Sequence, residues 1–337
     1  MEAAELWQRA KRGGAWLLSH QKADGQWCAL DQEALDAYYK AAWTLALLGE
    51  PLAAQRVLNH IERSFLLPDG DLGCRKNRWH REVHYPYANA YIVIGGMQLG
   101  RYALAQRVLR FLLTLRAPAS GAFASVRTED NVPVRCDTMS TAAAGLACVA
   151  AGQLAAACRA ADWLGWLVRA QPDPEKRFFC TVDAEGQLVT SFPTEDAPWR
   201  VVEALKPGQI WYAVGLPFVF LVKLAQATGK RAYLELAGWF FAFQERCDGP
   251  WTGPSSGKAG WGCAELYRMT GKAHYREVAL QVGEYMAQFQ SASGAFLLPL
   301  GTEDEGSRLY TAEDFDLTAE YTLWLAQISV NLQARTD

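Results

Sequence analysis

The chain has 337 residues, of which 50% are hydrophobic and 20% charged, with 33 basic against 36 acidic side chains. This composition is typical of a globular protein and excludes a disordered or collagen-like chain. The balanced charge excludes the basic patches that bind nucleic acid or an anionic membrane surface, so neither partner is expected.

The first residues, MEAAELWQRAKRGG, do not have the apolar core of a secretory leader. No later segment offers about 18 uninterrupted apolar residues, so we expect no integral membrane segment. The eight cysteines are scattered singly, without a CxxC pair, and several lie in apolar helical stretches. Free thiols of this kind are typical of a reducing compartment, and we expect a cytoplasmic protein.

Residues 12–27 contain the clearest copy of a repeated unit. A helix carrying Trp16 is followed by Gln21, and a short loop with Gly25 is closed by Trp27. Weaker copies of this unit begin at Trp166, Phe241 and Phe289, and two copies without the glutamine begin at Phe65 and Phe111. Six copies correspond to about 56 residues each, which is enough for two helices and a loop.

Two kinds of helical segment alternate along the chain. One kind is apolar on all sides and is typical of an interior, whereas the other is amphipathic and suits an outer layer. The apolar segments are residues 34–49, 87–100, 137–152, 210–229, 258–271 and 314–332. The alternation predicts an all-α fold, an (α/α)6 toroid with six inner and six outer helices.

Residues 171–208 depart from the helical pattern. Around Glu185 and Gly186 the sequence alternates with a period of two residues, which predicts a small β-hairpin insertion. Long polar loops are also expected at 69–86 and 292–313, each between an outer helix and the next inner helix. We therefore predict a single domain, residues 1–337, with a site on the face where the inner helices begin.

The unit at residues 12–27 resembles the QW motif of squalene-hopene and oxidosqualene cyclases. With its six helix pairs, the whole chain is similar to one α-α toroid domain of the terpenoid cyclase and protein prenyltransferase superfamily. The resemblance implies that the glutamine and tryptophan tie neighbouring outer helices together. The motif therefore indicates a fold and says little about chemistry.

Part of the chemistry of this superfamily also has a counterpart in the sequence. Asp316-Leu317-Thr318-Ala319-Glu320 is similar to the D-C-T-A-E segment of oxidosqualene cyclases, with leucine in place of the cysteine that supports the catalytic aspartate. The DxDD cluster of class II cyclases does not occur in the sequence. No histidine falls between His84 and His274, so the zinc site of the prenyltransferases is not expected.

Two carboxylates, Asp316 and Asp137, each stand at the start of a predicted inner helix. They can serve as helix caps, or they can face a common cavity because the inner helices all begin at one mouth of the toroid. Glu313 and Asp314 lie beside Asp316, and like-charge repulsion would then raise its pKa and make it a proton donor. Asp316 is the first choice for an acid catalyst.

Asp36, Lys40 and His84 are further candidates. Asp36 and Lys40 are one turn apart on an apolar segment, which predicts either an ion pair or a place in a polar cavity. His84 follows His80 in HxxxH spacing without the glutamate of HExxH, so we favour an acid–base or structural role and expect no metal. Asp36 and His84 complete the predicted catalytic set.

Aromatic side chains gather near the starts of the predicted inner helices. They can fill the core, or they can wall a cavity that stacks against a substrate or stabilises a carbocation. Lys258 lies at a helix start and could bind a carboxylate or phosphate group. The residues predicted to bind substrate are Tyr38, Tyr39, Tyr87, Trp211, Trp261, Lys258 and Tyr310.

The sequence and its resemblance together favour a cyclase or isomerase that works without a cofactor. Its substrate would be a small hydrophobic intermediate of natural product biosynthesis, of the terpenoid or polyketide kind, and a carboxylic acid would donate the proton. One alternative is a glycoside hydrolase or lyase, because other (α/α)6 enzymes use paired carboxylates on sugars. Another is a non-catalytic ligand-binding subunit. We expect a monomer or a homodimer.

Overall fold

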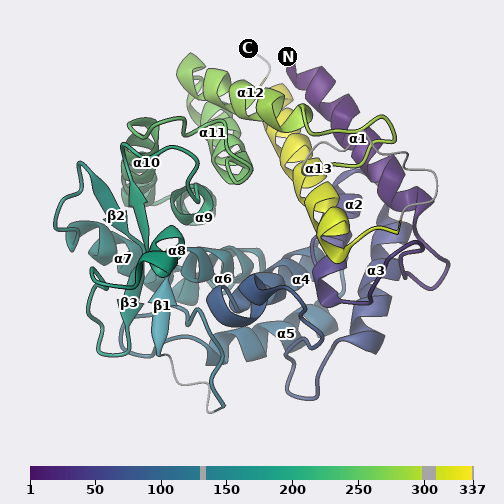
Figure 1. Cartoon of the computed structure of the whole chain (residues 1–337), viewed down its shortest axis with the longest axis horizontal. Helices are drawn as coiled ribbons and strands as arrows, with labels where there is room; N and C mark the ends of the chain where they lie inside the picture. The colour runs from purple at the N-terminus through teal and green to yellow at the C-terminus, as the bar shows by residue number, and fades with distance from the viewer. Residues whose placement is uncertain (130–133, 298–308, 336–337) are drawn as a thin grey trace.

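The helices of the protein form two concentric rings (Figure 1). The computed structural model describes residues 1–129, 134–297 and 309–335, so part of the predicted loop 292–313 lies outside the described residues. The inner helices are α2 (Ala41–Leu47), α4 (Pro86–Gln98), α6 (Thr138–Ala150), α9 (Tyr212–Thr228), α11 (Gly257–Thr270) and α13 (Ala312–Gln333). The outer helices are α1 (Ala3–Ser19), α3 (Pro51–Ser64), α5 (Tyr102–Thr114), α7 (Leu154–Arg169), α10 (Arg231–Glu245) and α12 (Ala273–Ala287).

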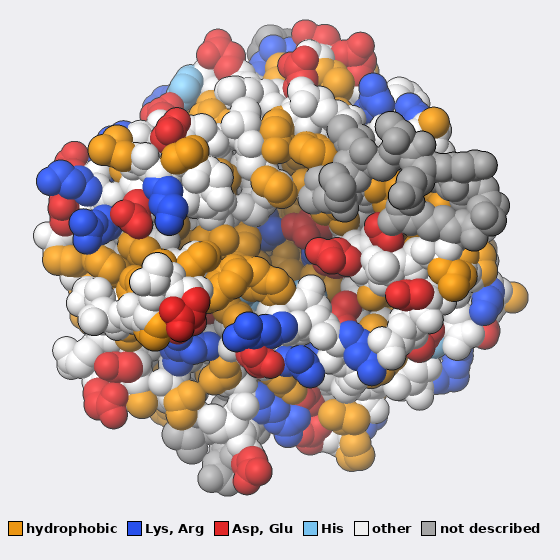
Figure 2. Space-filling model, viewed as in Figure 1, with side chains coloured by type: hydrophobic (Ala, Val, Ile, Leu, Met, Phe, Trp, Pro, Cys, Tyr) orange, Lys and Arg blue, Asp and Glu red, His pale blue; other side chains and the backbone are white. Residues whose placement is uncertain are grey.

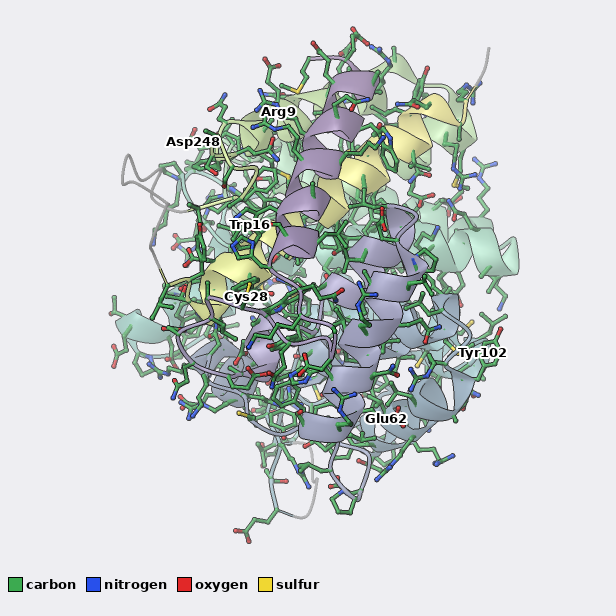
Figure 3. All side chains as sticks on the ribbon, turned by 90° about the vertical axis from the view of Figure 1, so that its right-hand side faces the viewer. Arg9, Trp16, Cys28, Glu62, Tyr102 and Asp248 are labelled. Atoms are coloured by element: carbon green, nitrogen blue, oxygen red, sulfur yellow. The ribbon has the colours of Figure 1, made fainter. Side chains whose placement is uncertain are left out.

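The inner ring is closed by packing between consecutive helices. Each inner helix contacts the next one in the order α2, α4, α6, α9, α11 and α13, and α13 returns to α2. Each inner helix also packs mainly against one outer helix, and α1 completes the outer ring by lying along α13. On α1, Trp16 points toward α13 and its ring lies 4.9 Å from that of Phe315 (Figure 3). The predicted (α/α)6 toroid is confirmed.

The first predicted inner helix is broken near its start. Residues 34–49 form a short 3-10 turn, Leu35–Ala37, and α2 begins only at Ala41. Hydrogen bonds from other parts of the chain stabilise this break, because the Asp36 carboxylate accepts bonds from the Lys76 and Asn77 amides. The other predicted inner helices begin and end within two residues of their expected bounds. Although the inner helices are apolar, none in the described part of the chain is long and apolar enough to cross a membrane.

Four of the repeated loops share one geometry. In each, an antiparallel bridge closes the loop, and a glycine in the left-handed region of φ lies against the backbone of an outer helix. The glycines and the arginines that they face are Gly25 and Arg56, Gly70 and Arg107, Gly121 and Arg159, and Gly294 and Arg12. Three of these arginines also donate hydrogen bonds to backbone carbonyls of the loop that they face. The repeat therefore ties neighbouring outer helices together, and its last copy connects the loop after α12 to α1.

This geometry predicts a large loss of stability for Gly25→Ala. Gly25 has φ +93°, and a Cβ atom there would overlap the carbonyl oxygen of Arg56. Gly49 has φ +84° but no described atom within 4 Å of the same position, so Gly49→Ala carries only the backbone strain. In urea unfolding we expect a loss of about 1–2 kcal/mol for Gly49→Ala and more than about 3 kcal/mol for Gly25→Ala. Equal losses for the two variants would contradict the close approach of loop and helix.

The residues between α7 and α9 form short strands at one side of the ring. Strand β2 (Arg177–Phe179) pairs with β4 (Val201–Glu203), and β3 (Thr181–Asp183) pairs with β1 (Arg135–Asp137), both antiparallel. The predicted turn around Gly186 does form, and among the described residues a single bridge, from Val182 to Leu188, closes it. A 3-10 turn, Thr194–Asp196, and the short helix α8 (Ala197–Arg200) complete the segment.

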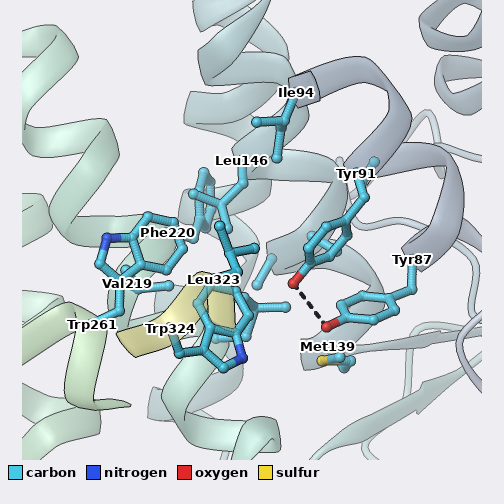
Figure 4. Close-up of a cluster of buried hydrophobic side chains, with 14 of the residues drawn as sticks. Tyr87, Tyr91, Ile94, Met139, Leu146, Val219, Phe220, Trp261, Leu323 and Trp324 are labelled. Carbon is cyan, nitrogen blue, oxygen red and sulfur yellow. Dashed lines mark hydrogen bonds between the residues drawn. The ribbon is translucent and has the colours of Figure 1, made fainter. Parts of the chain in front are cut away.

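An aromatic cluster fills the centre of the inner ring. We use this name for Trp43, Tyr91, Trp261 and Trp324, whose rings contact one another with centroids 5.3–6.4 Å apart. Trp261 and Trp324 are stacked, and the hydroxyl of Tyr91 is hydrogen-bonded to that of Tyr87 at 2.9 Å (Figure 4). Part of the high aromatic content therefore belongs to the hydrophobic core, where this cluster is buried between the inner helices.

Candidate active site

A cavity of about 320 Å³ lies where the inner helices begin. Its wall combines the charged side chains of Lys40, Lys258, Asp316 and Glu320 with two imidazoles and several tyrosines. Figure 2 shows a hollow at the centre of this face, with acidic and basic side chains inside it. The volume is at the low end of the range of about 300–1,000 Å³ for ligand pockets. Charged groups and aromatic faces thus share this wall.

Four charged side chains form what we call the ion-pair cluster: Lys40, Lys258, Asp316 and Glu320. The Lys40 ammonium donates to the Asp316 carboxylate at 3.0 Å and also to Glu320. Lys258 donates to the other oxygen of Glu320 at 2.5 Å. Asp316 and Glu320 lie one turn apart on α13, whereas Lys40 precedes α2 and Lys258 lies in the first turn of α11. Three inner helices are thus joined by one cluster.

The two carboxyl groups of the cluster have pKa values that are shifted in opposite directions. Burial raises the pKa of Asp316, Lys40 opposes this shift, and the neighbouring Glu320 charge reinforces it. Burial alone would raise the pKa of Glu320 as well, but the two lysines outweigh it and hold this pKa below its usual range. Among the described residues, the buried Oδ1 atom of Asp316 has no hydrogen-bond partner. Asp316 is therefore the carboxyl group of the cluster that is best placed to carry a proton.

His84 is held between a carboxylate and a phenol. Its Nδ1 atom lies 3.1 Å from Asp137, and its Nε2 atom lies 3.2 Å from the hydroxyl of Tyr212. Asp137 also caps α6 by accepting a 2.6 Å hydrogen bond from the Ser140 amide. Of the two roles that the sequence left open, Asp137 has that of the helix cap, and it stands behind the cavity wall in contact with His84. Because the carboxylate can accept a hydrogen bond from Nδ1–H, Nε2 is the ring nitrogen that faces the Tyr212 hydroxyl on the cavity wall.

His80 has the same arrangement on a neighbouring part of the wall. Its Nδ1 atom lies 2.5 Å from Asp36, and its Nε2 atom lies 3.3 Å from the hydroxyl of Tyr39. The carboxylate of Asp36 is fixed in turn by the backbone amides of residues 76 and 77. The cavity is therefore bordered by two Asp–His–Tyr chains, each with an oriented imidazole.

Both histidines stand on one irregular turn, the π-helical segment Trp79–Val83 and the residue after it. The buried Arg75 fixes this segment, because its guanidinium donates to the carbonyl of Tyr85 at 2.8 Å and to that of His80 at 3.5 Å. Arg75 is itself held by Asp71, at 3.0 Å. The spacing of the two imidazoles is thus set by buried polar contacts and not by a regular helix.

The buried carboxylate of Asp137 predicts a pH-dependent contribution to stability. Burial would raise the pKa of Asp137, but His84 and the Ser140 amide outweigh it and hold this pKa below its usual value. A depressed pKa stabilises the fold above the unfolded-state pKa, and this contribution is lost as the pH falls through the folded-state value. Asp137→Asn keeps the helix cap but removes the charge. We expect it to cost about 1.5–3 kcal/mol near neutral pH and less below about pH 4.

Urea unfolding of both proteins between about pH 6 and about pH 3 measures this difference. The exposed Asp248 (Figure 3) provides the matched control, because Asp248→Asn changes a surface carboxylate of the same kind. If the cost of Asp137→Asn stayed constant over the whole pH range, the charged partnership with His84 would not contribute to stability.

The structure brings many of the predicted site residues together. The cavity is lined by Asp316 and His84 from the predicted catalytic set, and by Tyr39, Tyr87 and Lys258 from the predicted binding set. Asp36 and Asp137 stand behind the wall, where each orients a histidine. The ion pair considered between Asp36 and Lys40 does not form, because Asp36 contacts His80 and Lys40 contacts α13.

The remaining predicted binding residues lie away from the cavity. Tyr38 stacks on Trp27 beside the first repeated loop, and Tyr310 packs edge-on against Trp16. Trp211 is fully buried at the start of α9, and Trp261 belongs to the aromatic cluster. Trp261 also faces a second cavity, of about 390 Å³, together with Trp43 and the ends of other inner helices.

The acidic neighbour that raises the pKa of Asp316 is not one of the two expected from the sequence, Glu313 and Asp314. Asp314 is hydrogen-bonded to the Thr311 amide at 2.8 Å as part of the cap of α13. The acidic side chain that raises the pKa of Asp316 is Glu320, one turn further on.

Sequence reasoning did not select four residues of this site: Lys40 as a partner of α13, Glu320, His80 and Tyr212. A usable signal was present for Glu320, because Asp316 and Glu320 are charges one turn apart on an otherwise apolar helix. Tyr212 carried a weaker signal, because it is one of the aromatic side chains near the start of a predicted inner helix. Among the described residues, no group of three or more histidine, cysteine or acidic side chains could hold a metal ion.

Comparisons with known proteins agree on the fold. No protein-family model and no curated protein sequence matches the chain, but solved structures do. A D-mannose isomerase matches with a TM-score of 0.70 and 13% identity, over 96% of this chain and 97% of its own. A GH76 α-mannanase from Bacteroides thetaiotaomicron has a TM-score of 0.63 and 14% identity, over 96% of each chain.

A type II terpene cyclase from Scytonema, solved with geranylgeranyl dihydroxybenzoate, has a TM-score of 0.60 and 13% identity, over 98% of this chain and 99% of its own. At these identities the comparisons show the toroid fold alone. The fold is thus shared with an isomerase, a glycoside hydrolase and a cyclase, and the resemblance to the terpenoid cyclases holds at the level of the fold.

Proposed function

We propose that the protein is an isomerase that works without a cofactor and moves a proton within a small, polar carbonyl compound. The observation that carries this proposal is the convergence of two oriented imidazoles on one cavity that also holds two buried ammonium groups. Such an isomerisation needs a base beside the carbon that loses its proton, an electrophile at the carbonyl oxygen, and an acid that returns a proton.

The residues of the cavity can fill these three roles. His84 is the proposed base, because Asp137 orients it and its Nε2 atom points to the Tyr212 hydroxyl on the cavity wall. A proton can pass to Nε2 directly or through this hydroxyl. Lys40 is the proposed electrophile: burial would lower its pKa, but Asp316 and Glu320 outweigh it and raise this pKa, so that Lys40 stays positively charged. Asp316, with its raised pKa, is the proposed acid.

The charged groups in the wall favour a substrate that carries polar groups over the purely hydrophobic one expected from the sequence. Apolar surface gains free energy only against apolar walls, whereas charged groups need polar partners. A small hydroxylated carbonyl compound offers such partners to Lys40 and Asp316. It also suits a cavity of about 320 Å³.

A proton-initiated cyclase is the second candidate. The observation that favours it is the combination of a carboxyl group with a raised pKa and aromatic faces at the same cavity. Tyr87, for example, lies under both lysines, with ammonium-to-ring distances of 5.6 and 5.7 Å. A ring that accommodates an ammonium can also stabilise a carbocation.

The glycoside hydrolase alternative has equal support from the fold comparisons but less from the geometry. In a glycosidase, two carboxyl groups flank the bond that is cleaved. Here Asp316 and Glu320 lie on one face of α13 and share the Lys40 ammonium. Asp36 and Asp137 are each bound to a histidine.

Deuterium exchange tests the proposed function. The purified protein is incubated in D2O with a panel of simple aldoses and ketoses, including D-mannose and D-fructose. Proton NMR then follows the signal of the hydrogen on the carbon next to the carbonyl group. We expect deuterium to enter this position only when the protein is present. Absence of exchange across the panel would contradict the proposal. Parallel samples with linear polyenes and with aryl glycosides test the cyclase and the hydrolase.

A further inference from the structure

The two lysines of the ion-pair cluster have unequal surroundings. Lys40 contacts two carboxylates, Asp316 and Glu320. Within the described part of the chain, Lys258 pairs with one oxygen of Glu320 alone, and the opposite oxygen of that carboxylate is taken by Lys40. The Oε1 atom that Lys258 contacts also accepts a 3.0 Å hydrogen bond from the Trp324 indole. The negative charge available to Lys258 is therefore shared among three donors.

The position of Lys258 in the fold also disfavours its charged form. It is the second residue of α11, Gly257–Thr270, where the helix dipole places partial positive charge. Only 3% of the side chain is exposed, so little water can solvate its ammonium. Burial lowers the pKa of Lys258, Glu320 opposes this shift and the charge of Lys40 reinforces it. A buried amine beside a second cation is the arrangement that activates lysine as a nucleophile.

We propose that Lys258 is a nucleophilic amine that forms an imine with the carbonyl group of the substrate. The inference rests on the proposed function only for the class of substrate, a carbonyl compound. Lys40 is less suited to this role, because its ammonium donates to both Asp316 and Glu320, whereas among the described residues Lys258 pairs with Glu320 alone.

The step balances without an oxidant or a reductant. The Nζ lone pair of the neutral amine attacks the carbonyl carbon, and the carbonyl oxygen takes the proton of the Asp316 carboxyl group. One proton then moves from nitrogen to the new hydroxyl, which leaves as water while the nitrogen lone pair forms the carbon–nitrogen double bond. The products are a protonated imine on Lys258, one water molecule and the Asp316 carboxylate, which regains its proton when the imine is hydrolysed.

The imine would make the proposed proton transfer easier. A protonated imine withdraws electrons more strongly than a carbonyl group, so the neighbouring carbon–hydrogen bond becomes more acidic. His84 borders the same cavity and would remove this proton. Lys258 would then be part of the isomerisation and not only a binding group.

Reductive trapping tests the proposal on the unaltered protein. The full chain is incubated near neutral pH with glycolaldehyde and sodium cyanoborohydride, digested, and analysed by peptide mass spectrometry. We expect Lys258 to be labelled at least about tenfold faster than the exposed Lys272. Labelling that follows exposure, with Lys272 ahead of Lys258, would overturn the proposal. Equal labelling of Lys40 and Lys258 would also overturn it.

A conservative variant gives a second readout. Lys258→Arg keeps the positive charge but cannot form an imine, and circular dichroism checks that it is folded. Loss of deuterium exchange in folded Lys258→Arg supports the proposal, whereas full exchange overturns it. The two proposals can fail separately: trapping at Lys258 without exchange contradicts only the isomerase, and exchange that persists in Lys258→Arg contradicts only the imine.

Discussion

Replacing His84 with glutamine is expected to lower the rate of deuterium exchange by about a hundred- to ten-thousand-fold, the usual contribution of a general base. The imidazole is the proposed proton acceptor, and glutamine fills similar space without a titrating nitrogen. Asp137 would keep a hydrogen-bonding partner, so the variant should remain folded. Initial exchange rates by proton NMR, with folding checked by circular dichroism, measure the effect.

The matched control is His274→Gln. His274 is an exposed histidine that contacts Glu245 far from the cavity, so its replacement should leave the exchange rate unchanged. His80→Gln separates two mechanisms, because a two-base enzyme loses activity with either histidine and a one-base enzyme loses it with only one. A His84→Gln variant as active as His274→Gln would remove the imidazole from the mechanism.

The fold could be predicted because its signals are local. An inner helix such as residues 210–229 is apolar on every side and stops at Gly229, whose φ of +70° ends the helix. The repeated loops can be recognised by their glycines, because a residue with a side chain would not fit at Gly25 or Gly294. Periodicity and turn residues within about 20 positions of each other decide these features.

The partners within the site could not be predicted because they come from distant parts of the chain. Asp36 and His80 are separated by 44 positions, and Lys40 and Glu320 by 280. The sequence showed only the local alternative, Asp36 with Lys40 one turn away. That pair would have required a continuous helix, and the break before Ala41 removes it.

The same break explains why neighbouring tyrosines have different surroundings. Tyr39 lines the cavity, whereas Tyr38 packs against Trp27 outside it. In a regular helix, consecutive residues differ in direction by a known angle, but residues 38–40 are not helical. A prediction from the helical pattern therefore could not choose between the two.

Replacing Glu320 with glutamine is expected to cost about 3–5 kcal/mol in the free energy of unfolding, the usual effect of removing one partner from a buried ion pair. In the variant, none of the described carboxylates would contact Lys258, and Lys40 would keep Asp316 alone among them. Both ammonium groups have only 2–3% of their side chains exposed, so water cannot replace the lost charge. Urea unfolding near neutral pH measures the loss.

The matched control is Glu235→Gln on the outer surface. Glu235 pairs with Arg231 at 3.3 Å, but 68% of its side chain is exposed, so its loss should cost less than about 1 kcal/mol. Similar costs for Glu235→Gln and Glu320→Gln would show that the cluster is solvated in solution.

A double variant separates the charge from the shape of the side chain. If Glu320→Gln destabilises the fold because it leaves Lys258 uncompensated, then Lys258→Met should recover part of the loss when both changes are combined. Simple addition of the two single effects would mean that Glu320 and Lys258 do not interact. The cavity would then lack the shared carboxylate on which the different roles of Lys40 and Lys258 depend, and the assignment of a charged and a nucleophilic lysine would fail with it.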